Sequence, residues 1–185
     1  MLYALALTSG MRQGELLALR WADVDLDART ASVRQTLYRG KNGTYSFQPP
    51  KTTRSRRHVA LAVVAVAALR RHRVRQNAER LLTGDRWTDL DLVFANEEGR
   101  PMRGTRATHT FQAALRRAGL PRVRFHDLRH TSASLLLGRG VHPKIASEML
   151  GHSTIAITLD LYSHVTPTMQ RGAADELDAA LSGSA

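Results

Sequence analysis

Cysteine is absent from the 185 residues of this chain. Disulfide frameworks, thiolate metal sites and cysteine nucleophiles are therefore excluded. No apolar run approaches the about 20 residues that a membrane-spanning helix needs, and no signal-peptide pattern opens the chain. These absences favour a cytoplasmic protein whose chemistry comes from other side chains.

Acidic residues are few beside basic ones. The chain has 16 Asp and Glu against 27 Lys and Arg, which gives a formal net charge of +11. This excess is larger than solubility alone requires and predicts a polyanionic partner. Nucleic acid fits that partner better than a membrane does. An apolar content of 43% is enough for a sizeable core, and the length suits one ordinary domain.

The hydrophobic pattern predicts an α+β fold that is mainly helical. Residues 2–21 read as two helical pieces broken at Gly10, and "PKIASEML" reads as a short helix that starts at Pro143 and ends at Gly151. "TASVRQTLYRGKNGTYSF" contains a hairpin signal at Asn42-Gly43, and "RRHVALA" reads as a further strand. These segments predict a small antiparallel three-stranded sheet. Further helices are expected over residues 63–82, 108–119 and 126–137, and "DLVFANEEGRPM" is expected to form a short strand and a glycine turn.

Two of the expected helices present distinct faces. In "HDLRHTSASLLL", three cationic or titratable residues share one face, and the opposite side, with Leu128, Leu135 and Leu136, is expected to be buried. The tail over residues 166–185 is expected to form an amphipathic helix. Its apolar stripe consists of Met169, Ala173, Leu177 and Ala180.

Each polar feature has an ordinary structural explanation when it is taken alone. Arg12 and Glu15 fit an intrahelical ion pair, and Lys51 fits a turn lysine in a run of arginines that ends at Arg57. Two histidines four residues apart on a helix can bind a metal, but "HDLRH" lacks the glutamate of the zinc-protease motif. Tyr162 fits a core tyrosine whose hydroxyl is hydrogen-bonded. Only the combination of these residues favours a shared function.

The combination resembles the catalytic domain of the tyrosine recombinases, the phage integrase family, from about Leu2 to Arg171. "TSGMRQGELLALRWADVD" is similar to the family's first arginine motif, "PPKTTRSRRHVAL" to its lysine hairpin and "HDLRH" to its His-x-x-Arg box. "LGHS" and "LDLYSH" are similar to the second histidine and the tyrosine nucleophile. The resemblance implies catalytic roles for Arg12, Lys51, His126, Arg129, His152 and Tyr162, with Glu15 and His130 as supporting residues.

The implied activity is site-specific DNA recombination through a covalent 3′-phosphotyrosine. Arg12, Arg129 and His152 would bind the phosphate, His126 would act as the base, and Lys51 would protonate the leaving 5′-oxygen. No metal or cofactor is implied. The expected partner is double-stranded DNA, with a monomer in solution and a homotetramer on DNA in the full-length context.

Two other functions are compatible with these residues: DNA relaxation of the type IB topoisomerase kind, and an inactive DNA-binding remnant. The short tail after Tyr162 argues against relaxation. The family's N-terminal core-binding domain has no counterpart in residues 1–185, which read as the catalytic domain with a helical tail over 166–185.

Overall fold

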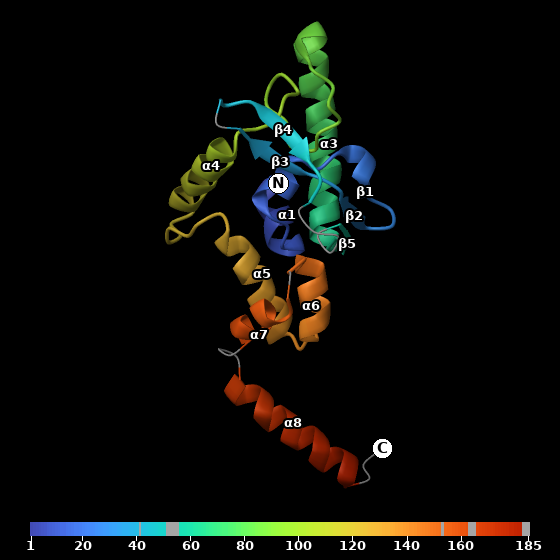
Figure 1. The fold of residues 1–185 in the computed structure, drawn as a ribbon, viewed down its shortest axis with the longest axis vertical. Coiled ribbons are helices and arrows are strands. Elements are labelled where there is room, and N and C mark those ends of the chain that lie inside the picture. The colour runs from blue at the N-terminus through green and yellow to red at the C-terminus, as the bar shows by residue number, and fades with distance from the viewer. Residues whose placement is uncertain (41, 51–55, 153, 163–165, 183–185) are drawn as a thin grey trace.

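A computed structural model of the chain describes residues 1–40, 42–50, 56–152, 154–162 and 166–182, and gives only the backbone for 161, 162, 166–170, 173 and 176. Figure 1 shows α1 in the middle of the molecule, with the strands and α3 beside it and α5, α6 and α7 beneath it. The helices are α1 (Leu2–Ser9), α2 (Gln13–Leu17), η1 (Trp21–Asp23), α3 (Val63–Thr83), η3 (Gly84–Arg86), α4 (Gly104–Arg117), α5 (Asp127–Gly138), α6 (Pro143–Leu150), α7 (Ala156–Tyr162) and α8 (Thr166–Leu181). The strands are β1 (Val24–Asp25), β2 (Thr30–Val33), β3 (Thr36–Arg39), β4 (Tyr45–Gln48) and β5 (Arg57–Ala60).

The α+β architecture predicted from the sequence is confirmed, including an antiparallel three-stranded sheet. Its order is β1-β2-β5, with Ala31 opposite Val59 in the pairing of β2 with β5. The predicted hairpin at Asn42-Gly43 forms, but β3 and β4 make a separate two-stranded sheet. The chain leaves the first sheet between β2 and β3, where the Gln35 amide donates to the Ala18 carbonyl at 2.7 Å.

The hydrophobic core lies between α1, α2, the first sheet and the start of α3. Three aromatic rings extend it towards α4 and α5: the ring centroid of Tyr3 lies 5.0 Å from that of Phe111 and 6.2 Å from that of Phe125. The core consists mainly of aliphatic side chains, among them Leu5, Leu16, Val33, Val59, Leu69 and Val93. α1 also packs directly against α5, which brings the loop after α1 close to the start of α5.

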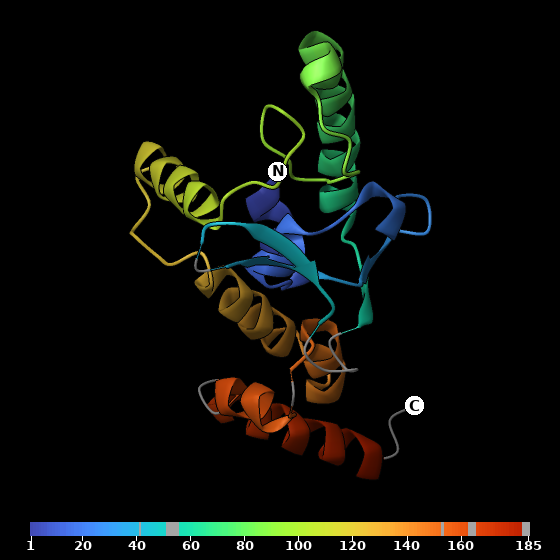
Figure 2. The same ribbon diagram turned by 45° about the horizontal axis from the view of Figure 1, so that its top comes forward.

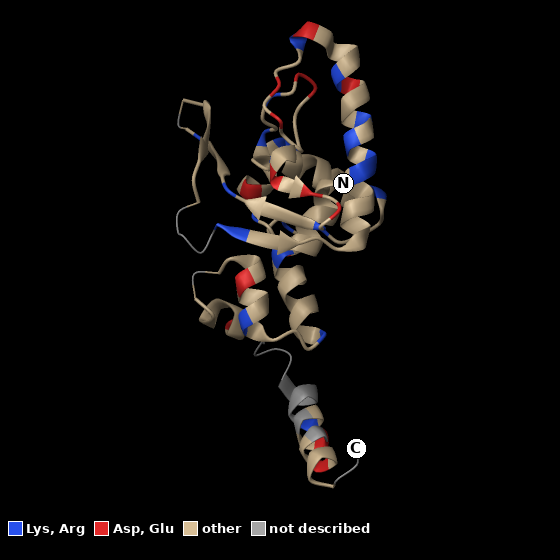
Figure 3. Cartoon of the chain, turned by 90° about the vertical axis from the view of Figure 1, so that its right-hand side faces the viewer, with Lys and Arg blue, Asp and Glu red and all other residues tan. Residues whose placement is uncertain are grey.

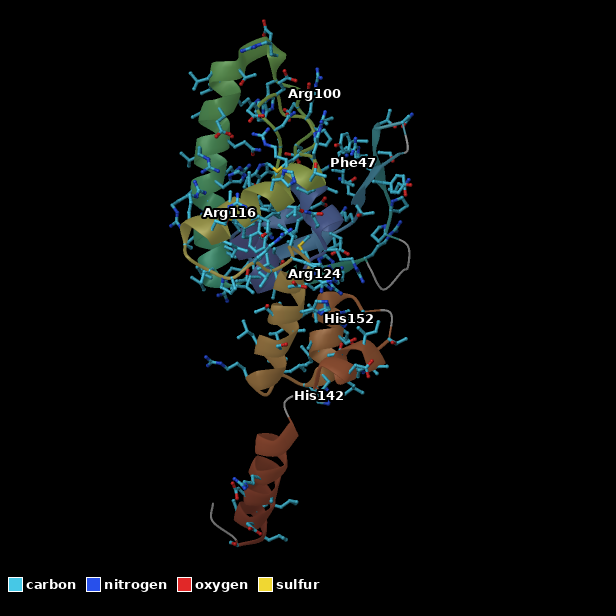
Figure 4. The ribbon with its side chains drawn as sticks, turned by 90° about the vertical axis from the view of Figure 1, so that its left-hand side faces the viewer. Phe47, Arg100, Arg116, Arg124, His142 and His152 are labelled. Atoms are coloured by element: carbon cyan, nitrogen blue, oxygen red, sulfur yellow. The ribbon has the colours of Figure 1, made fainter. Side chains whose placement is uncertain are left out.

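The predicted helix termini at Gly10, Pro143 and Gly151 are confirmed. Gly10 adopts a left-handed backbone with φ 61° and donates its N–H to the Ala6 carbonyl, so α1 ends there. Pro143 occupies the first turn of α6, and Gly151 ends that helix with φ 66°. Figure 4 shows His142 and His152 at opposite ends of α6, with His152 at the end nearer the sheets.

Two sequence-based expectations were wrong. Leu135 is 55% exposed, and Leu128 and Leu136 are only partly buried, so they do not form the buried side of α5. The buried side is that of Arg129, with Ser132, Ala133 and Leu137. The segment 91–101 forms isolated bridges, Arg20 to Leu92 and Ala95 to Pro101, rather than a regular strand; its glycine turn is present, with Gly99 at φ 76°.

α8 extends away from the rest of the molecule, as the views in Figures 1 and 3 agree. Leu177 of its predicted stripe is 63% exposed and Ala180 is exposed too, whereas the Met169 and Ala173 side chains lie outside the described residues. No helix in the described part of the chain is long and apolar enough to cross a membrane.

Candidate active site

Arg12 and Glu15 form a compact unit at the start of α2. Arg12 is extended and caps the helix, and Glu15 stands at its third position. The Glu15 carboxylate accepts the Arg12 backbone N–H through Oε2 and the Arg12 Nη1 through Oε1, both at 2.9 Å. The Arg12 Nη2 donates to the Gly151 carbonyl at 2.8 Å. The guanidinium of Arg12 is therefore fixed on two sides, while its side chain stays 41% exposed.

A second arginine, Arg57, binds the same carboxylate from β5. Its Nη2 lies 2.9 Å from Glu15 Oε2, its Nη1 lies 3.2 Å from Oε1, and its Nε donates to the Met149 carbonyl at 2.8 Å. Burial alone would raise the pKa of Glu15, but the hydrogen bonds and charges of Arg57 and Arg12 outweigh it, so this pKa lies below its ordinary value. Glu15 is thus an ionised, 4% exposed carboxylate between two guanidiniums.

Arg129 is the most deeply buried cation of the group. Its side chain projects from α5, where its Nη1 donates to the Gly10 carbonyl at 2.7 Å and the Leu150 carbonyl at 2.5 Å. Burial, followed by the charge of Arg12, lowers the pKa of Arg129 to about 9, which leaves it cationic at neutral pH. Its Nη2 is buried and has no hydrogen-bond partner among the described residues. A buried donor of this kind is suited to an anionic ligand.

His152 follows Gly151 directly, so it sits beside the carbonyl that binds Arg12. Its Nδ1 lies 2.8 Å from the hydroxyl of Thr158, a fully buried residue of α7. This contact engages Nδ1 and leaves Nε2 as the ring nitrogen for another partner. Burial, then the charges of Arg129 and Arg12, lower the pKa of His152 to about 4. The ring is therefore neutral at pH 7.

His126 and His130 lie on the solvent side of α5. Both are exposed, and their ring centroids are 4.9 Å apart in an edge-to-face arrangement. Burial, followed by the charges of His130 and Arg129, lowers the pKa of His126, which keeps this ring neutral at pH 7. In the described parts of the chain, no three His, Asp or Glu side chains gather in a way that would hold a metal ion.

The catalytic roles of all six residues remain predictions, and the side chains of two of them lie outside the described parts of the chain. Lys51 lies outside the described residues, and Tyr162 is described only as the last backbone position of α7. The structure brings together Arg12, Glu15, Arg129 and His152 around Gly10, Leu150 and Gly151.

Sequence reasoning missed the roles of Arg57 and Thr158. Arg57 looked like one more turn arginine, although it stands two residues before Val59, which is fully buried in the same strand. Residues two apart in a strand face the same side, and an arginine in the inward register needs a buried partner. That register was the signal that could have identified it. Arg57, Gly151 and His152 also line a cavity of about 470 Å³ between β5, α6 and the residues that precede α7.

Comparison with known proteins identifies the fold and the family. Residues 1–169 match the phage integrase family. The chain belongs to the phage integrase family. A XerC-like tyrosine recombinase of Caldanaerobacter subterraneus is 36% identical over 188 residues, which cover 96% of this chain and 48% of that protein. An integrase of Streptomyces ambofaciens is 34% identical, with 91% of this chain and 45% of that protein covered.

Solved structures of phage integrase relatives show the same fold. The Tn1549 transposon integrase, in complex with transposon right end DNA, matches 96% of this chain and 58% of that chain with a TM-score of 0.81 and 24% identity. The XerA recombinase matches 94% of this chain and 55% of that chain with a TM-score of 0.66 and 25% identity. The chain spans about half the length of the curated relatives it matches.

Proposed function

We propose that this phage integrase domain cleaves and rejoins DNA in site-specific recombination through a covalent 3′-phosphotyrosine. The observation that supports this most is the buried Nη2 of Arg129, which lies near Arg12 and His152 and has no hydrogen-bond partner among the described residues. Two positive charges and a neutral imidazole converge there, and the Glu15 carboxylate beside them is already engaged by two arginines. Such a centre favours an anion over a neutral ligand.

The proposed ligand is the scissile phosphodiester. Displacement at phosphorus increases the negative charge on the non-bridging oxygens, and guanidiniums meet that charge with planar, bidentate donors. Arg12 and Arg129 fill this role because both are held before substrate arrives. His152, neutral at pH 7, adds a hydrogen bond from Nε2 in the tautomer that carries its proton there.

Tyr162 is the proposed nucleophile. Its phenolic oxygen forms a bond to phosphorus, while the bond from phosphorus to the 5′-oxygen breaks. His126 takes the phenol proton, and Lys51 gives a proton to the leaving 5′-oxygen. Rejoining reverses both transfers, so the ester energy is kept in the phosphotyrosine and no metal or cofactor is consumed. The neutrality of His126 at pH 7 is compatible with its role as the base.

Double-stranded DNA is the proposed partner. The net charge of +11 supports electrostatic attraction to it, and Figure 3 shows basic residues spaced along α3. A second DNA-binding domain would complete a clamp around the duplex. The protein would be a monomer in solution and a tetramer on DNA, with α8 exchanged between subunits. The exposed Leu177 and the extension of α8 away from the other helices support this exchange.

The two other functions are less well supported. Among the curated relatives and solved structures compared above, the named activities are those of recombinases and integrases, which does not favour relaxation of the topoisomerase kind. A DNA-binding remnant would bind duplex DNA without forming a covalent adduct, so one experiment separates it from the recombinase.

The test is covalent capture on DNA. A pool of nicked duplexes with a randomised central sequence lets the chain select its own substrate, because release of a short 5′-hydroxyl strand traps the adduct. We expect a protein–DNA adduct in wild type and none in Tyr162→Phe, with DNA affinity unchanged. Arg129→Lys should form far less adduct, since an ammonium lacks the planar fork. An adduct in Tyr162→Phe would refute the assignment of the nucleophile, and no adduct in wild type would refute the proposed activity of this chain.

A further inference from the structure

Arg57 joins three segments that are far apart in the sequence. It begins β5, it binds Glu15 of α2, which lies 42 positions earlier, and it donates to Met149 of α6, which lies 92 positions later. Its side chain is 6% exposed, so these contacts are shielded from water. A buried ion pair of this kind is sensitive to the loss of either partner.

The geometry of the contacts requires a guanidinium. The two Nη atoms of Arg57 meet the two carboxylate oxygens of Glu15, and the Nε meets the Met149 carbonyl. The planar fork provides these donors in fixed directions, whereas the ammonium of a lysine is a compact charge that does not reproduce them. Arg57 therefore fixes both the position and the orientation of the carboxylate.

The same carboxylate holds Arg12. Glu15 Oε1 accepts from Arg12 Nη1 and from Arg57 Nη1, so a rotation of the carboxylate would move both guanidiniums. A second link runs through Gly151, whose carbonyl binds Arg12 Nη2. A methyl group at Gly151 would lie 2.8 Å from Arg57 Nη1, which shows how closely Arg57 packs against this residue.

We propose that Arg57 is a positioning residue that orients Arg12 through Glu15 and ties the start of β5 to the α6–α7 link. The start of β5 follows residues 51–55, which include Lys51, and the α6–α7 link carries His152. Arg57 thus connects the segments proposed to supply the phosphate-binding arginine and the histidine. The inference rests on the proposed function, and it assigns Arg57 a role that acts through Glu15 and Met149 rather than through a contact with the phosphate.

Three variants separate positioning from simple stabilisation: Arg57→Lys, Arg57→Gln and the matched control Arg70→Gln. Arg70 is an exposed arginine of α3 that pairs with Asp27, so its loss removes the same charge away from the site. The measurements are the thermal midpoint, the Kd for the captured DNA, and the rate of adduct formation at saturating DNA. For Arg57→Lys we expect a folded protein, a Kd within about 2-fold of wild type, and a rate about 10- to 100-fold lower, because small misplacements have effects of that size.

The control variant Arg70→Gln should keep the wild-type rate. Full rescue of the rate by lysine would overturn the inference, because charge alone would then suffice. The inference would also be overturned if the rate of Arg57→Gln fell only in proportion to its folded fraction.

A double-mutant comparison tests whether Arg57 acts through Glu15. If it does, Arg57→Gln combined with Glu15→Gln should lower the rate no further than the more damaging single change, within about 2-fold. If the fold-losses in rate of the two single variants multiply in the double variant, Arg57 does not act through Glu15, since independent effects are additive in free energy.

Inorganic vanadate provides a readout that does not need DNA cleavage. If wild type forms no adduct, the proposed function fails, and the inference is then judged by calorimetric vanadate binding, with Arg129→Ala to locate the site. We expect wild type to bind vanadate, Arg129→Ala to lose it, and Arg57→Lys to bind it about 10-fold more weakly. Equal binding by wild type and Arg57→Lys, or no binding by wild type, would overturn the inference.

Discussion

The substitution Glu15→Gln tests whether one buried carboxylate holds the guanidiniums of Arg12 and Arg57 in place. Glutamine keeps the shape of the side chain, and its amide oxygen can still accept the Arg12 backbone N–H in the capping box. The amide nitrogen then replaces the other oxygen, which accepts from Arg12 Nη1 and Arg57 Nη1. The N–H groups of Arg12 Nη1 and Arg57 Nη1 would then face the N–H groups of the amide. The negative charge that compensates the two guanidiniums would also be lost.

The expected loss of stability is large. Glu15 is 4% and Arg57 6% exposed, and removal of one partner of a buried pair costs about 3–5 kcal/mol. For a domain of this size, that is a fall of about 10 °C in the thermal midpoint. Urea unfolding followed by circular dichroism measures the loss directly, provided that the slope of the unfolding free energy against urea is unchanged.

The pH dependence gives the same experiment a second readout. Because the folded-state pKa of Glu15 lies below its ordinary value of 4.5, its stabilisation is complete above that pH and is lost as the pH falls through the folded pKa. The difference between wild type and Glu15→Gln should therefore be greatest near neutral pH and shrink below pH 4.5.

Glu97→Gln is the matched control. Glu97 also accepts a guanidinium fork, from Arg106, and its pKa is lowered to about 2 by that hydrogen bond. Its side chain is 70% exposed, however, so solvent screening limits the loss to below about 1 kcal/mol. A cost for Glu15→Gln no greater than that for Glu97→Gln would refute the central role of Glu15.

Three further predictions concern the same site and its partner. Gly151→Ala should destabilise the protein and slow adduct formation, because φ is 66° there and the new methyl group would lie 2.8 Å from Arg57 Nη1; urea unfolding and the capture assay measure the two effects. The His152 ring should remain neutral until the pH approaches 4. Its contribution to the stability of the folded protein is therefore complete above pH 6.5 and is lost as the pH falls through 4. An NMR titration of its ring protons with a midpoint near pH 6.5 would contradict this. DNA binding by residues 1–185 should be weak, poor in sequence selectivity and strongly reduced by salt; a salt-insensitive Kd would contradict it.

Local signals in the sequence were enough to place most of the helices. Pro143 and Gly151 delimit α6, and Gly10 ends α1, because proline and glycine restrict or permit particular backbone angles whatever packs around them. Asn42-Gly43 predicted the β3–β4 hairpin for the same reason. The sheet to which that hairpin belongs depends instead on distant contacts, such as the bond from Gln35 to Ala18.

The buried face of α5 shows what periodicity cannot provide. Leu128, Leu135 and Leu136 suggested one side, yet the helix buries the side of Arg129, where the Gly10 and Leu150 carbonyls accept hydrogen bonds from its Nη1. Spacing identifies which residues share a face, but the element that covers that face is set by the fold. The strand register could have shown that Arg57 is buried, but its partners could not be predicted from the sequence, since they lie 42 and 92 positions away.

The bonded residues of the candidate active site lie far apart in the sequence, and these separations decide when the site can form during synthesis. Arg12 bonds to Gly151 across 139 positions, and Arg129 bonds to Gly10 across 119. At about 5–20 residues per second, Arg12 is made about 7–28 s before Gly151. During that interval the nascent chain acquires most of its Lys and Arg residues, but it has no carbonyl at position 151 and no histidine at 152. Under the proposed function, the charge that attracts DNA would therefore be made before the residues that complete the phosphate site, and an unfinished chain would bind DNA without being able to cut it.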